Sequence, residues 1–331
     1  MTYPLPLKIL GVGRYLPDRI VLSSELERKA GLTAGWIERK QGVKERRRVA
    51  LETNSEMSAA AAREALDDAG LQPADLDLIL NASGTTEQAI PDGAPLIQHH
   101  LGLGESGIAC FSVHTTCLSF LTAFDLSASL LATGRYRRIL IASAEITSKG
   151  LNWADQETST LFGDGAAAAV VGLTPAGEMS AVHGARFETY GSGARFTQVM
   201  GCGTSRPPNH PDTRAEDNLF HMDAEAVLLM TFRHAPQFLE HLKFAIPGGL
   251  SQLDVVIPHQ ASRLALDSHT RFGFKRQQIV RTLECLGNCV AASIPLTLHA
   301  AIRCGRLSRG NRALLLGTGA GLSFGGVVFT Y

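Results

Sequence analysis

Residues 114–142 read HTTCLSFLTAFDLSASLLATGRYRRILIA and combine two patterns that together indicate the fold class. The stretch from Leu118 to Ala132 predicts a helix that ends at Gly134, because glycine readily adopts the left-handed conformation found after helix ends. Residues 138–142 form a short and mostly apolar run, which is typical of a buried strand. A helix followed at once by a buried strand favours an α/β fold.

The same alternation recurs on both sides of this stretch. Helices are expected at residues 54–69, 224–242 and 291–304, and strands at residues 8–13, 77–82, 166–171, 254–257 and 313–316. Because the strands are short and continuously apolar, helices should cover both faces of each sheet. We therefore predict an α/β chain of two similar halves, residues 1–172 and 173–331. The polar residues 201–217 indicate an exposed loop.

The composition is that of an ordinary globular protein. The chain has 331 residues, of which 45% are hydrophobic and 19% charged, and its formal net charge is zero. This balance predicts neither nucleic acid nor a membrane surface as the main partner. Residues 1–8 lack the pattern of a signal peptide, and no apolar run is long enough to span a bilayer. We therefore expect a cytoplasmic protein.

The cysteines are scattered through the chain. They are Cys110, Cys117, Cys202, Cys285, Cys289 and Cys304. No two of them form a CxxC pair, so a disulfide framework or a structural zinc site is not expected. In a reducing compartment most of them should be buried and inert.

Cys117 differs from the other cysteines because it directly precedes a predicted helix. The unpaired N–H groups and the dipole of a helix N-terminus favour the thiolate, which is the nucleophilic form. A small buried side chain that happens to precede a helix also explains the local sequence, and taken alone it explains it better.

Two polar residues of the second half are candidates for the same site. His259 follows a predicted strand and Pro258, at the strand end where α/β folds gather catalytic groups. A core histidine bonded to the backbone is an equally good interpretation. Asn288, between Gly287 and Cys289, reads by itself as a turn residue. Together, His259 and Asn288 could donate two hydrogen bonds to one developing oxyanion.

Glycine-rich and basic segments suggest ligand contacts. Gly317–Gly321 predicts a turn that lets a backbone N–H approach a substrate, but it lacks the Lys-Ser/Thr of a phosphate-binding P-loop. Gly11-Val12-Gly13 is weak support for a dinucleotide site. A basic cluster could hold a phosphate-bearing cofactor or an acidic carrier protein, and a solvated surface explains it as well. Its members are Arg39, Lys40, Lys44, Arg46, Arg47 and Arg48.

Taken together, these segments resemble the β-ketoacyl-acyl carrier protein synthase III branch of the thiolase superfamily, over nearly the whole chain. The likeness is carried by residues 11–17, Trp36-Ile37, residues 42–47, the Cys117 segment, residues 161–166, residues 258–261, Gly287-Asn288, residues 291–295 and the terminal glycines. The order and spacing of these motifs are specific to the family. They therefore favour catalytic roles for Cys117, His259 and Asn288 over the purely structural roles considered above.

The resemblance implies a thiolase fold: two fused βαβαβαββ halves in five-layer α-β-α-β-α packing, as a homodimer. It also implies that Cys117 takes an acyl group from coenzyme A, with the backbone N–H groups of Cys117 and Ala320 as the oxyanion hole. His259 and Asn288 would then hold the enolate formed when a malonyl thioester, on acyl carrier protein or coenzyme A, loses carbon dioxide. No metal or redox cofactor is implied, and coenzyme A thioesters enter as substrates.

Substrate contacts also follow from the resemblance, with departures from the family pattern. Trp36 and Lys40 match residues that contact the coenzyme A nucleotide, and Lys40 stands where arginine is common. Gln156 and Ser262 replace a further arginine and an asparagine, and Phe120 is expected near the acyl tunnel.

Three further departures bear on the acceptor and the pathway. Leu264 replaces a basic residue linked to carrier-protein docking, and family members with leucine after the nucleophile, as Leu118 is here, include enzymes of olefin and secondary-metabolite pathways. Ile90 aligns with a glutamate that olefin-forming relatives contribute from the dimer partner. Because Ile90 cannot act as that base, decarboxylative condensation or acyl transfer to a small acceptor is favoured over the olefin reaction.

Three alternatives remain open at this point. A synthase III-like acyltransferase would move the acyl group from Cys117 to a hydroxyl or amine without forming a carbon–carbon bond. A hydrolase with a Cys-His-Asn triad fits the chain order, but the sequence around Cys117 lacks the papain-like signature. A non-catalytic partner subunit is the third.

Overall fold

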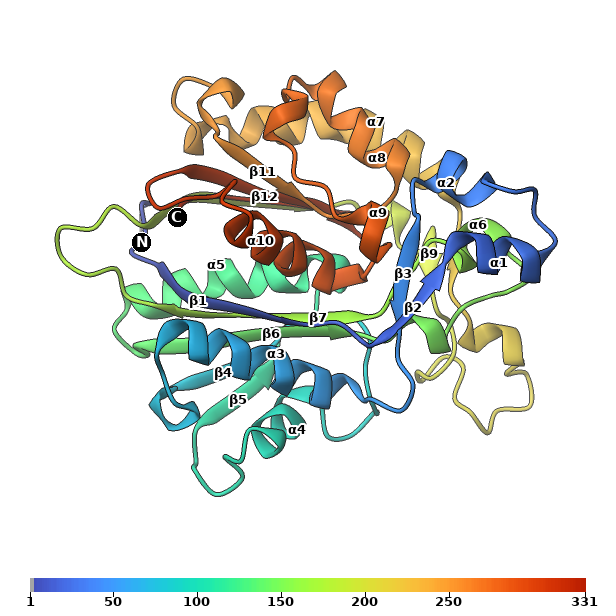
Figure 1. Ribbon diagram of the computed structural model, residues 1–331, viewed down its shortest axis with the longest axis horizontal. Helices are drawn as coiled ribbons and strands as arrows, with labels where there is room; N and C mark the ends of the chain where they lie inside the picture. Colours follow the sequence, from blue (N-terminus) through green and yellow to red (C-terminus); the bar gives the residue numbers. More distant parts are fainter. Residues whose placement is uncertain (1–2) are drawn as a thin grey trace.

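The computed structural model describes residues 3–331 as five stacked layers (Figure 1). Met1 and Thr2, which belong to the segment considered for a signal peptide, lie outside the described residues. The first sheet has five strands in the order β1-β7-β6-β4-β5. Their bounds are β1 Lys8–Tyr15, β7 Gly165–Gly172, β6 Arg138–Glu145, β4 Leu78–Asn81 and β5 Ala109–Ser112. All of these strands come from the first predicted half of the chain.

The second sheet has four strands in the order β11-β12-β13-β8. Their bounds are β11 Val255–Pro258, β12 Arg312–Gly319, β13 Ser323–Thr330 and β8 Ala181–Thr189. A complete βαβαβαββ half would have a fifth strand, but here a single bridge between Val256 and Ile279 stands in its place. The segment is too short for a strand because Ile279 and Val280 lie between a 3-10 turn, Arg276–Gln278, and the polar Arg281.

Helices fill the remaining three layers (Figure 1). The outer face of the first sheet carries α3 (Asn54–Ala69) and α4 (Gly93–His100). The middle layer holds α5 (Ser119–Ala132) and α10 (Ser293–Arg303), and the far layer holds α7 (Ala224–Leu242) and α8 (Arg263–Ser268). This α-β-α-β-α packing confirms the predicted fold class.

Smaller elements surround one end of the sheets. They are β2 (Arg19–Leu22), α1 (Ser23–Ala30), α2 (Trp36–Gln41), β3 (Glu45–Arg48), α6 (Gln156–Ser159), β9 (Thr197–Gln198), β10 (His221–Met222) and α9 (Leu283–Leu286). The predicted loop at residues 201–217 is a run of turns with one short 3-10 helix, Ala215–Asn218.

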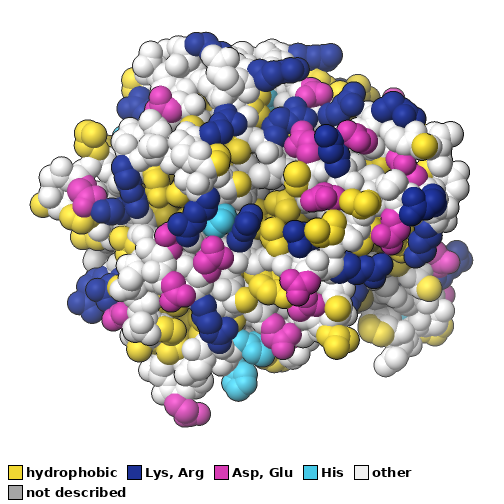
Figure 2. Space-filling view, in the orientation of Figure 1, with side chains coloured by type: hydrophobic (Ala, Val, Ile, Leu, Met, Phe, Trp, Pro, Cys, Tyr) yellow, Lys and Arg dark blue, Asp and Glu magenta, His cyan; other side chains and the backbone are white. Residues whose placement is uncertain are grey.

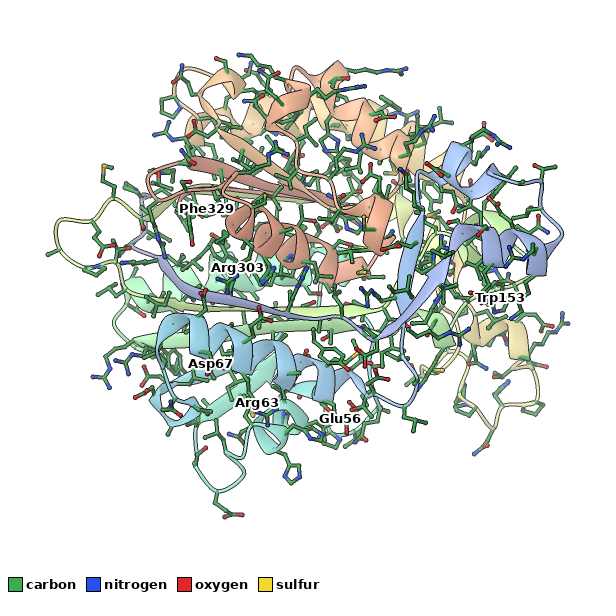
Figure 3. The ribbon with its side chains drawn as sticks, in the orientation of Figure 1. Glu56, Arg63, Asp67, Trp153, Arg303 and Phe329 are labelled. Carbon is green, nitrogen blue, oxygen red and sulfur yellow. The ribbon has the colours of Figure 1, made fainter. Side chains whose placement is uncertain are left out.

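Helix α3 shows how local sequence and packing agree. Its N-terminus has a capping box between Thr53 and Glu56, and the chain leaves the helix at Gly70 with φ 66°. A Cβ at Gly13 would lie 2.2 Å from the carbonyl oxygen of Ala61, so glycine in β1 and alanine in α3 let the two backbones approach closely. Figure 3 shows Glu56 and other charged side chains of α3 on its outer side.

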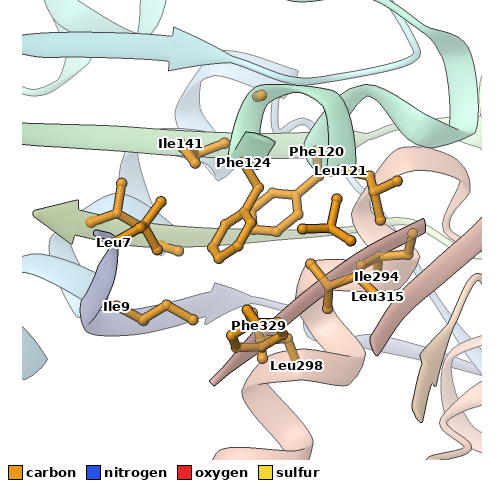
Figure 4. Close-up of a cluster of buried hydrophobic side chains, with 14 of the residues drawn as sticks. Leu7, Ile9, Phe120, Leu121, Phe124, Ile141, Ile294, Leu298, Leu315 and Phe329 are labelled. Carbon is orange, nitrogen blue, oxygen red and sulfur yellow. The ribbon is translucent and has the colours of Figure 1, made fainter. Parts of the chain in front are cut away.

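One apolar cluster joins the two halves. It contains Leu7, Ile9, Phe120, Phe124 and Phe329, together with side chains of β6, α10 and β12 (Figure 4). The rings of Phe124 and Phe329 meet edge to face, with centroids 5.4 Å apart. Because α5 and α10 bury their apolar sides between the sheets, neither half has a core of its own in this layer.

Two predicted segments differ from the structure in the same way. The strand expected at residues 8–13 continues to Tyr15, and the glycine turn expected at residues 317–321 belongs to β12 as far as Gly319. Glycine was taken as the sign of a turn, whereas here it allows close packing within a strand.

The prediction that most cysteines are buried was wrong. Only Cys289 is buried, whereas Cys202, Cys285 and Cys304 are exposed and the other two are partly buried. Cys202 lies in a bend, Cys285 within the short helix α9, and Cys304 at the C-terminal end of α10.

The surface mixes both charge signs. Lys and Arg side chains alternate with Asp and Glu side chains across the face drawn in Figure 2. Within residues 3–331, no helix is both long and apolar enough to cross a membrane.

Candidate functional site

Cys117 lies in a strained 3-10 turn, Thr116–Leu118, that leads into α5. Thr116 has a φ of 52°, which is rare for a β-branched residue and marks local backbone strain. The hydroxyl of Ser119 stabilises the turn: it donates to the Thr116 carbonyl at 2.7 Å and accepts from the Thr115 N–H at 3.0 Å. The cysteine therefore has a fixed position at the start of α5.

The thiol is protonated at neutral pH, contrary to the expectation from the helix terminus. Burial, followed by the negative charge of Glu145, raises the pKa of Cys117 to about 12. The backbone N–H groups of Ala320 and Cys117 oppose this shift by donating toward the sulfur. Loss of contact with water outweighs these donors, so a thiolate must form during the reaction.

His259 directly follows β11, as the sequence predicted for this strand end. Its N–H donates to the carbonyl of Leu316 on β12 at 2.7 Å, which fixes the backbone. The side chain is buried, and Nδ1 has no hydrogen-bond partner among the described residues. Burial lowers the pKa of His259 to about 4, so the imidazole is neutral at physiological pH and can accept a proton.

Asn288 is fixed by hydrogen bonds on every side. Its N–H donates to the Leu161 carbonyl and its own carbonyl accepts from Gly163, both at 3.0 Å. The side-chain Oδ1 accepts from Val290 at 2.8 Å, and Nδ2 donates to the Ala261 carbonyl at 3.2 Å. Since an amide nitrogen carries two N–H groups, one remains for a ligand.

The glycines of β12 bring these segments together. A Cβ at Gly317 would lie 3.0 Å from both the His259 Cβ and the Leu118 Cδ2. A Cβ at Gly319 would lie 2.8 Å from the Thr116 Oγ1. His259 and the Cys117 turn thus meet on the same face of β12, against glycines that leave no room for side chains of their own.

Glu145 is a site residue that sequence reasoning missed. It ends β6 next to the Cys117 turn and is fully buried, and burial raises its pKa to about 7. The predicted strand stopped at Ala142, which left Glu145 in an assumed loop. A carboxylate that ends a continuously buried strand was the signal available in the sequence.

Two arginines of the basic cluster point inward, which contradicts both interpretations considered for them. Arg46 is 0% and Arg48 is 7% exposed. Arg46 Nη2 donates to the Ser23 hydroxyl at 3.1 Å and to the Thr160 carbonyl at 2.8 Å, and burial lowers its pKa to about 9. Arg46 therefore supports the segment that pairs with Asn288 and is not available to bind phosphate.

Four predicted substrate-binding residues lie on neighbouring elements at one rim. Trp36 begins α2 and packs against the apolar cluster beneath it. Lys40 forms an exposed ion pair with Glu157 at 3.2 Å, and Gln156 Nε2 donates to the Ala30 carbonyl at 3.2 Å. Ser262 caps α8 by accepting from the N–H of Ala265 at 3.2 Å.

Trp153, which is drawn near this rim in Figure 3, has the ammonium group of Lys29 5.2 Å from its ring centre. The polar groups of the rim are thus largely engaged with one another.

The last two predicted binding residues lie apart from this rim. Phe120 is 0% exposed and packs against Phe124 in the shared core, with ring centroids 6.3 Å apart. Ile90 is 86% exposed, on the loop that follows β4. No group of three or more His, Cys, Asp or Glu side chains within residues 3–331 is arranged to hold a metal ion.

Comparison with known proteins places this geometry in a family. The model for the 3-oxoacyl-[acyl-carrier-protein] synthase III family matches residues 111–191, and the model for its C-terminal part matches residues 248–331. The chain is 36% identical over 323 residues to the acetoacetyl CoA synthase of Streptomyces sp. (strain CL190), covering 96% of each protein.

Solved structures agree with this assignment. The chain superimposes on 3-oxoacyl-[acyl-carrier-protein] synthase III from Aquifex aeolicus with a TM-score of 0.87 and 30% identity, covering 98% of this chain and 100% of that one. It also superimposes on the priming β-ketosynthase of the R1128 polyketide pathway with a TM-score of 0.86 and 29% identity, covering 100% and 98%.

Proposed function

Because the chain belongs to the 3-oxoacyl-[acyl-carrier-protein] synthase III family of acyltransferases, we propose that it loads an acyl group onto Cys117 and condenses it with a malonyl thioester. The observation that carries this proposal is the meeting of the Cys117 turn and His259 at the glycines of β12, with the Asn288 amide bonded to the carbonyl of Ala261, two residues after His259. The product is a β-ketoacyl thioester.

In the first half-reaction the Cys117 sulfur attacks the carbonyl of an acyl-coenzyme A. The thiol proton passes to neutral His259 and leaves on the coenzyme A sulfur, so the bond formed and the bond broken are both thioester bonds. The N–H groups of Ala320 and Cys117 face the sulfur and would stabilise the oxyanion on the attacked carbonyl. Proton transfer to His259 in this step accounts for a nucleophile that rests as the neutral thiol.

In the second half-reaction a malonyl thioester loses carbon dioxide, and the electron pair of the broken bond forms an enolate. His259 and the free N–H of Asn288 Nδ2 donate to the enolate oxygen. The enolate carbon then attacks the Cys117 thioester, the carbon–sulfur bond to Cys117 breaks, and the released thiolate takes up a proton from water. Most of the remaining rate enhancement comes from holding both thioesters in attack geometry.

The rim residues would bind the coenzyme A or carrier-protein part of the thioester. We propose that Trp36 and Lys40 contact the coenzyme A nucleotide, with Gln156 and Ser262 at the edge of this contact. The ion pair of Lys40 with Glu157 supports weak binding of the coenzyme A nucleotide, since part of the lysine charge is already neutralised. Leu264, 52% exposed on α8, offers no charge to an acidic carrier protein.

A homodimer is the proposed assembly. Strand β5 is the edge of the first sheet, and its outward residues include Phe111, which is 41% exposed. Ile90 is 86% exposed near the same sheet edge, and we propose that it shapes the acyl pocket of the partner subunit. Size-exclusion chromatography with light scattering should give twice the chain mass of 35.4 kDa. Since the proposed substrates are cytoplasmic metabolites, we also propose a cytoplasmic location.

The function is tested by incubating the protein with an acyl-coenzyme A and malonyl-coenzyme A or malonyl-carrier protein. Release of carbon dioxide with a product that contains the new β-keto unit is the expected result. An ester or amide would instead identify the acyltransferase alternative, and a free acid would identify a hydrolase. Condensation of two acyl-coenzyme A molecules without a malonyl donor would contradict the proposal.

A further inference from the structure

Glu145 is a buried carboxylate beside Cys117 to which the steps above give no role. Its oxygens are held by backbone N–H groups: Gly84 donates to Oε1 at 2.5 Å and Thr85 donates to Oε2 at 2.8 Å. The backbone of Ala291 and the hydroxyl of Thr85 also contribute. The side chain is therefore bound in the protein interior by amide dipoles, and because burial raises its pKa to about 7, the carboxylate and the protonated acid coexist near neutral pH.

Three functional segments meet at this carboxylate. A Cβ at Gly84 would lie 3.2 Å from Glu145 Oε1, 3.0 Å from Val290 Cγ1 and 3.5 Å from the Thr116 carbonyl oxygen. Thr116 precedes the nucleophile, and the Val290 N–H bonds Asn288 Oδ1 at 2.8 Å. Glu145 thus lies where the Cys117 turn and the Asn288 turn contact Gly84 and Thr85, at the start of the loop that contains Ile90.

Both turns that it contacts are strained. Thr116 and Val290 are β-branched residues with φ angles of 52° and 43°. Such conformations persist only when neighbouring groups hold them in place. The bonds from Glu145 to Gly84, Thr85 and Ala291 are among the contacts that can do so.

The carboxylate is costly for folding. Burying an acid without a cationic partner opposes folding by several kcal/mol before hydrogen bonds offset it. An amide such as glutamine would avoid this cost and still accept one N–H. A charged group at this place is therefore better explained by the site than by stability.

We infer that Glu145 is a positioning residue: it holds the Ile90 loop and the Asn288 turn against the Cys117 turn. This inference rests on the proposed role of Cys117 as the acyl carrier. The hydrogen bonds of Glu145 maintain the geometry needed for condensation, and its negative charge adds to burial, the larger cause, in raising the pKa of the Cys117 thiol.

The other titratable groups that face this cluster are Cys289 and His114. The His114 Nε2 lies 3.1 Å from the Gly84 carbonyl oxygen, and the charge of Glu145 contributes to raising the pKa of the buried Cys289 thiol. A pH profile must therefore be read against a variant that changes Glu145 alone.

Glu145→Gln removes the charge, and Glu145→Asp keeps the charge but withdraws it by one methylene. Glu87→Gln is the matched control, because Glu87 is exposed on the same loop and accepts from the Ser55 N–H at 2.9 Å. The three readouts are alkylation of Cys117 by iodoacetamide against pH, acyl loading by intact mass, and the condensation rate.

We expect Glu145→Gln to shift the alkylation profile about 1–3 pH units toward lower pH. Glu145→Asp should leave this profile unchanged. Both variants should still load an acyl group, but condensation should fall about tenfold or more, since misplaced groups lose attack geometry. Glu87→Gln should match the wild type in all three measurements.

A wild-type alkylation profile and a wild-type condensation rate in Glu145→Gln would overturn the inference. If that variant does not fold, Glu145→Asp carries the test, and an unchanged condensation rate there would overturn it equally. A wild-type protein that takes an acyl group from no donor would instead contradict the proposed function, and the alkylation profiles would still report on Glu145.

Discussion

The floor and the rim of the site are built in different ways. On the floor, His259 and Asn288 are buried and their backbones are bonded to strands or turns of both halves. On the rim, Lys40 and Glu157 leave 57% and 56% of their side chains exposed and pair with each other. The fold thus fixes the reaction geometry. Binding of the coenzyme A or carrier-protein part of the thioester instead depends on exposed side chains that already interact with water and with each other.

The largest expected effect beyond loss of the nucleophile is on the floor. Asn288→Ala should lower the rate of malonyl decarboxylation about 10²–10³-fold, as removal of one oxyanion donor typically does. It should leave acyl loading of Cys117 intact, because Asn288 acts in the second half-reaction. Labelled carbon dioxide release and intact mass measure the two steps, with Gln156→Ala as the rim control. If acyl loading in Asn288→Ala fell as much as decarboxylation, Asn288 would not be specific to the second half-reaction.

A smaller change tests whether the fold alone sets the floor. Gly319→Ala places a Cβ 2.8 Å from the Thr116 Oγ1 and must displace the nucleophile turn. Condensation should fall about 10²-fold, the loss expected for a displacement near 1 Å. Gly104→Ala is the matched control, since its nearest neighbour would be 3.8 Å away. Equal activities in the two variants would show that the turn tolerates movement.

The buried part of the site should also make the free energy of unfolding depend on pH, through Glu145. The pKa of Glu145 is raised from 4.5 to about 7 in the folded protein, so between these values the folded state binds more protons than the unfolded state. The free energy of unfolding should therefore fall as pH rises through this window, by an amount on the order of 3 kcal/mol. Urea unfolding at several pH values should show this slope in the wild type and a weaker one in Glu145→Gln. The same slope in both proteins would assign it to other groups.

The smallest effect belongs to the rim. Lys40→Ala should raise KM for acyl-coenzyme A about two- to fivefold with kcat unchanged, the range of an exposed ion pair. Glu157→Gln frees the lysine and should lower KM. Both differences should shrink in high salt. A lower kcat for Lys40→Ala would show that Lys40 affects the chemical step and not only substrate binding.

The sequence predicts the fold because its strands and helices follow simple periodicities. Helix α7 was expected at its observed bounds, and α3 was located by its alanines and by Gly70. Apolar strands flanked by helices left few arrangements other than stacked layers. The family motifs then predicted that Cys117, His259 and Asn288 share one site; the structure brings His259 and the Cys117 turn together at β12, and the catalytic roles of the three residues stay a prediction.

What the sequence did not predict depends on contacts between distant segments. Glu145 acquires its importance from Gly84 and Ala291, which lie far from it along the chain. Arg46 reads as a surface charge until β3 turns its side chain toward Ser23 and Thr160. The neutral state of Cys117 likewise comes from burial and a neighbouring charge, which outweigh the local helix-terminus effect.

The central claim is that Cys117 carries the acyl group. Intact-protein mass after incubation with a series of acyl-coenzyme A donors, followed by addition of a malonyl thioester, tests it most directly. We predict a mass gain of one acyl group in the wild type, its loss when the malonyl thioester is added, and no gain in Cys117→Ala. A gain of the same size in Cys117→Ala, or an adduct that persists after the malonyl thioester is added, would contradict the account.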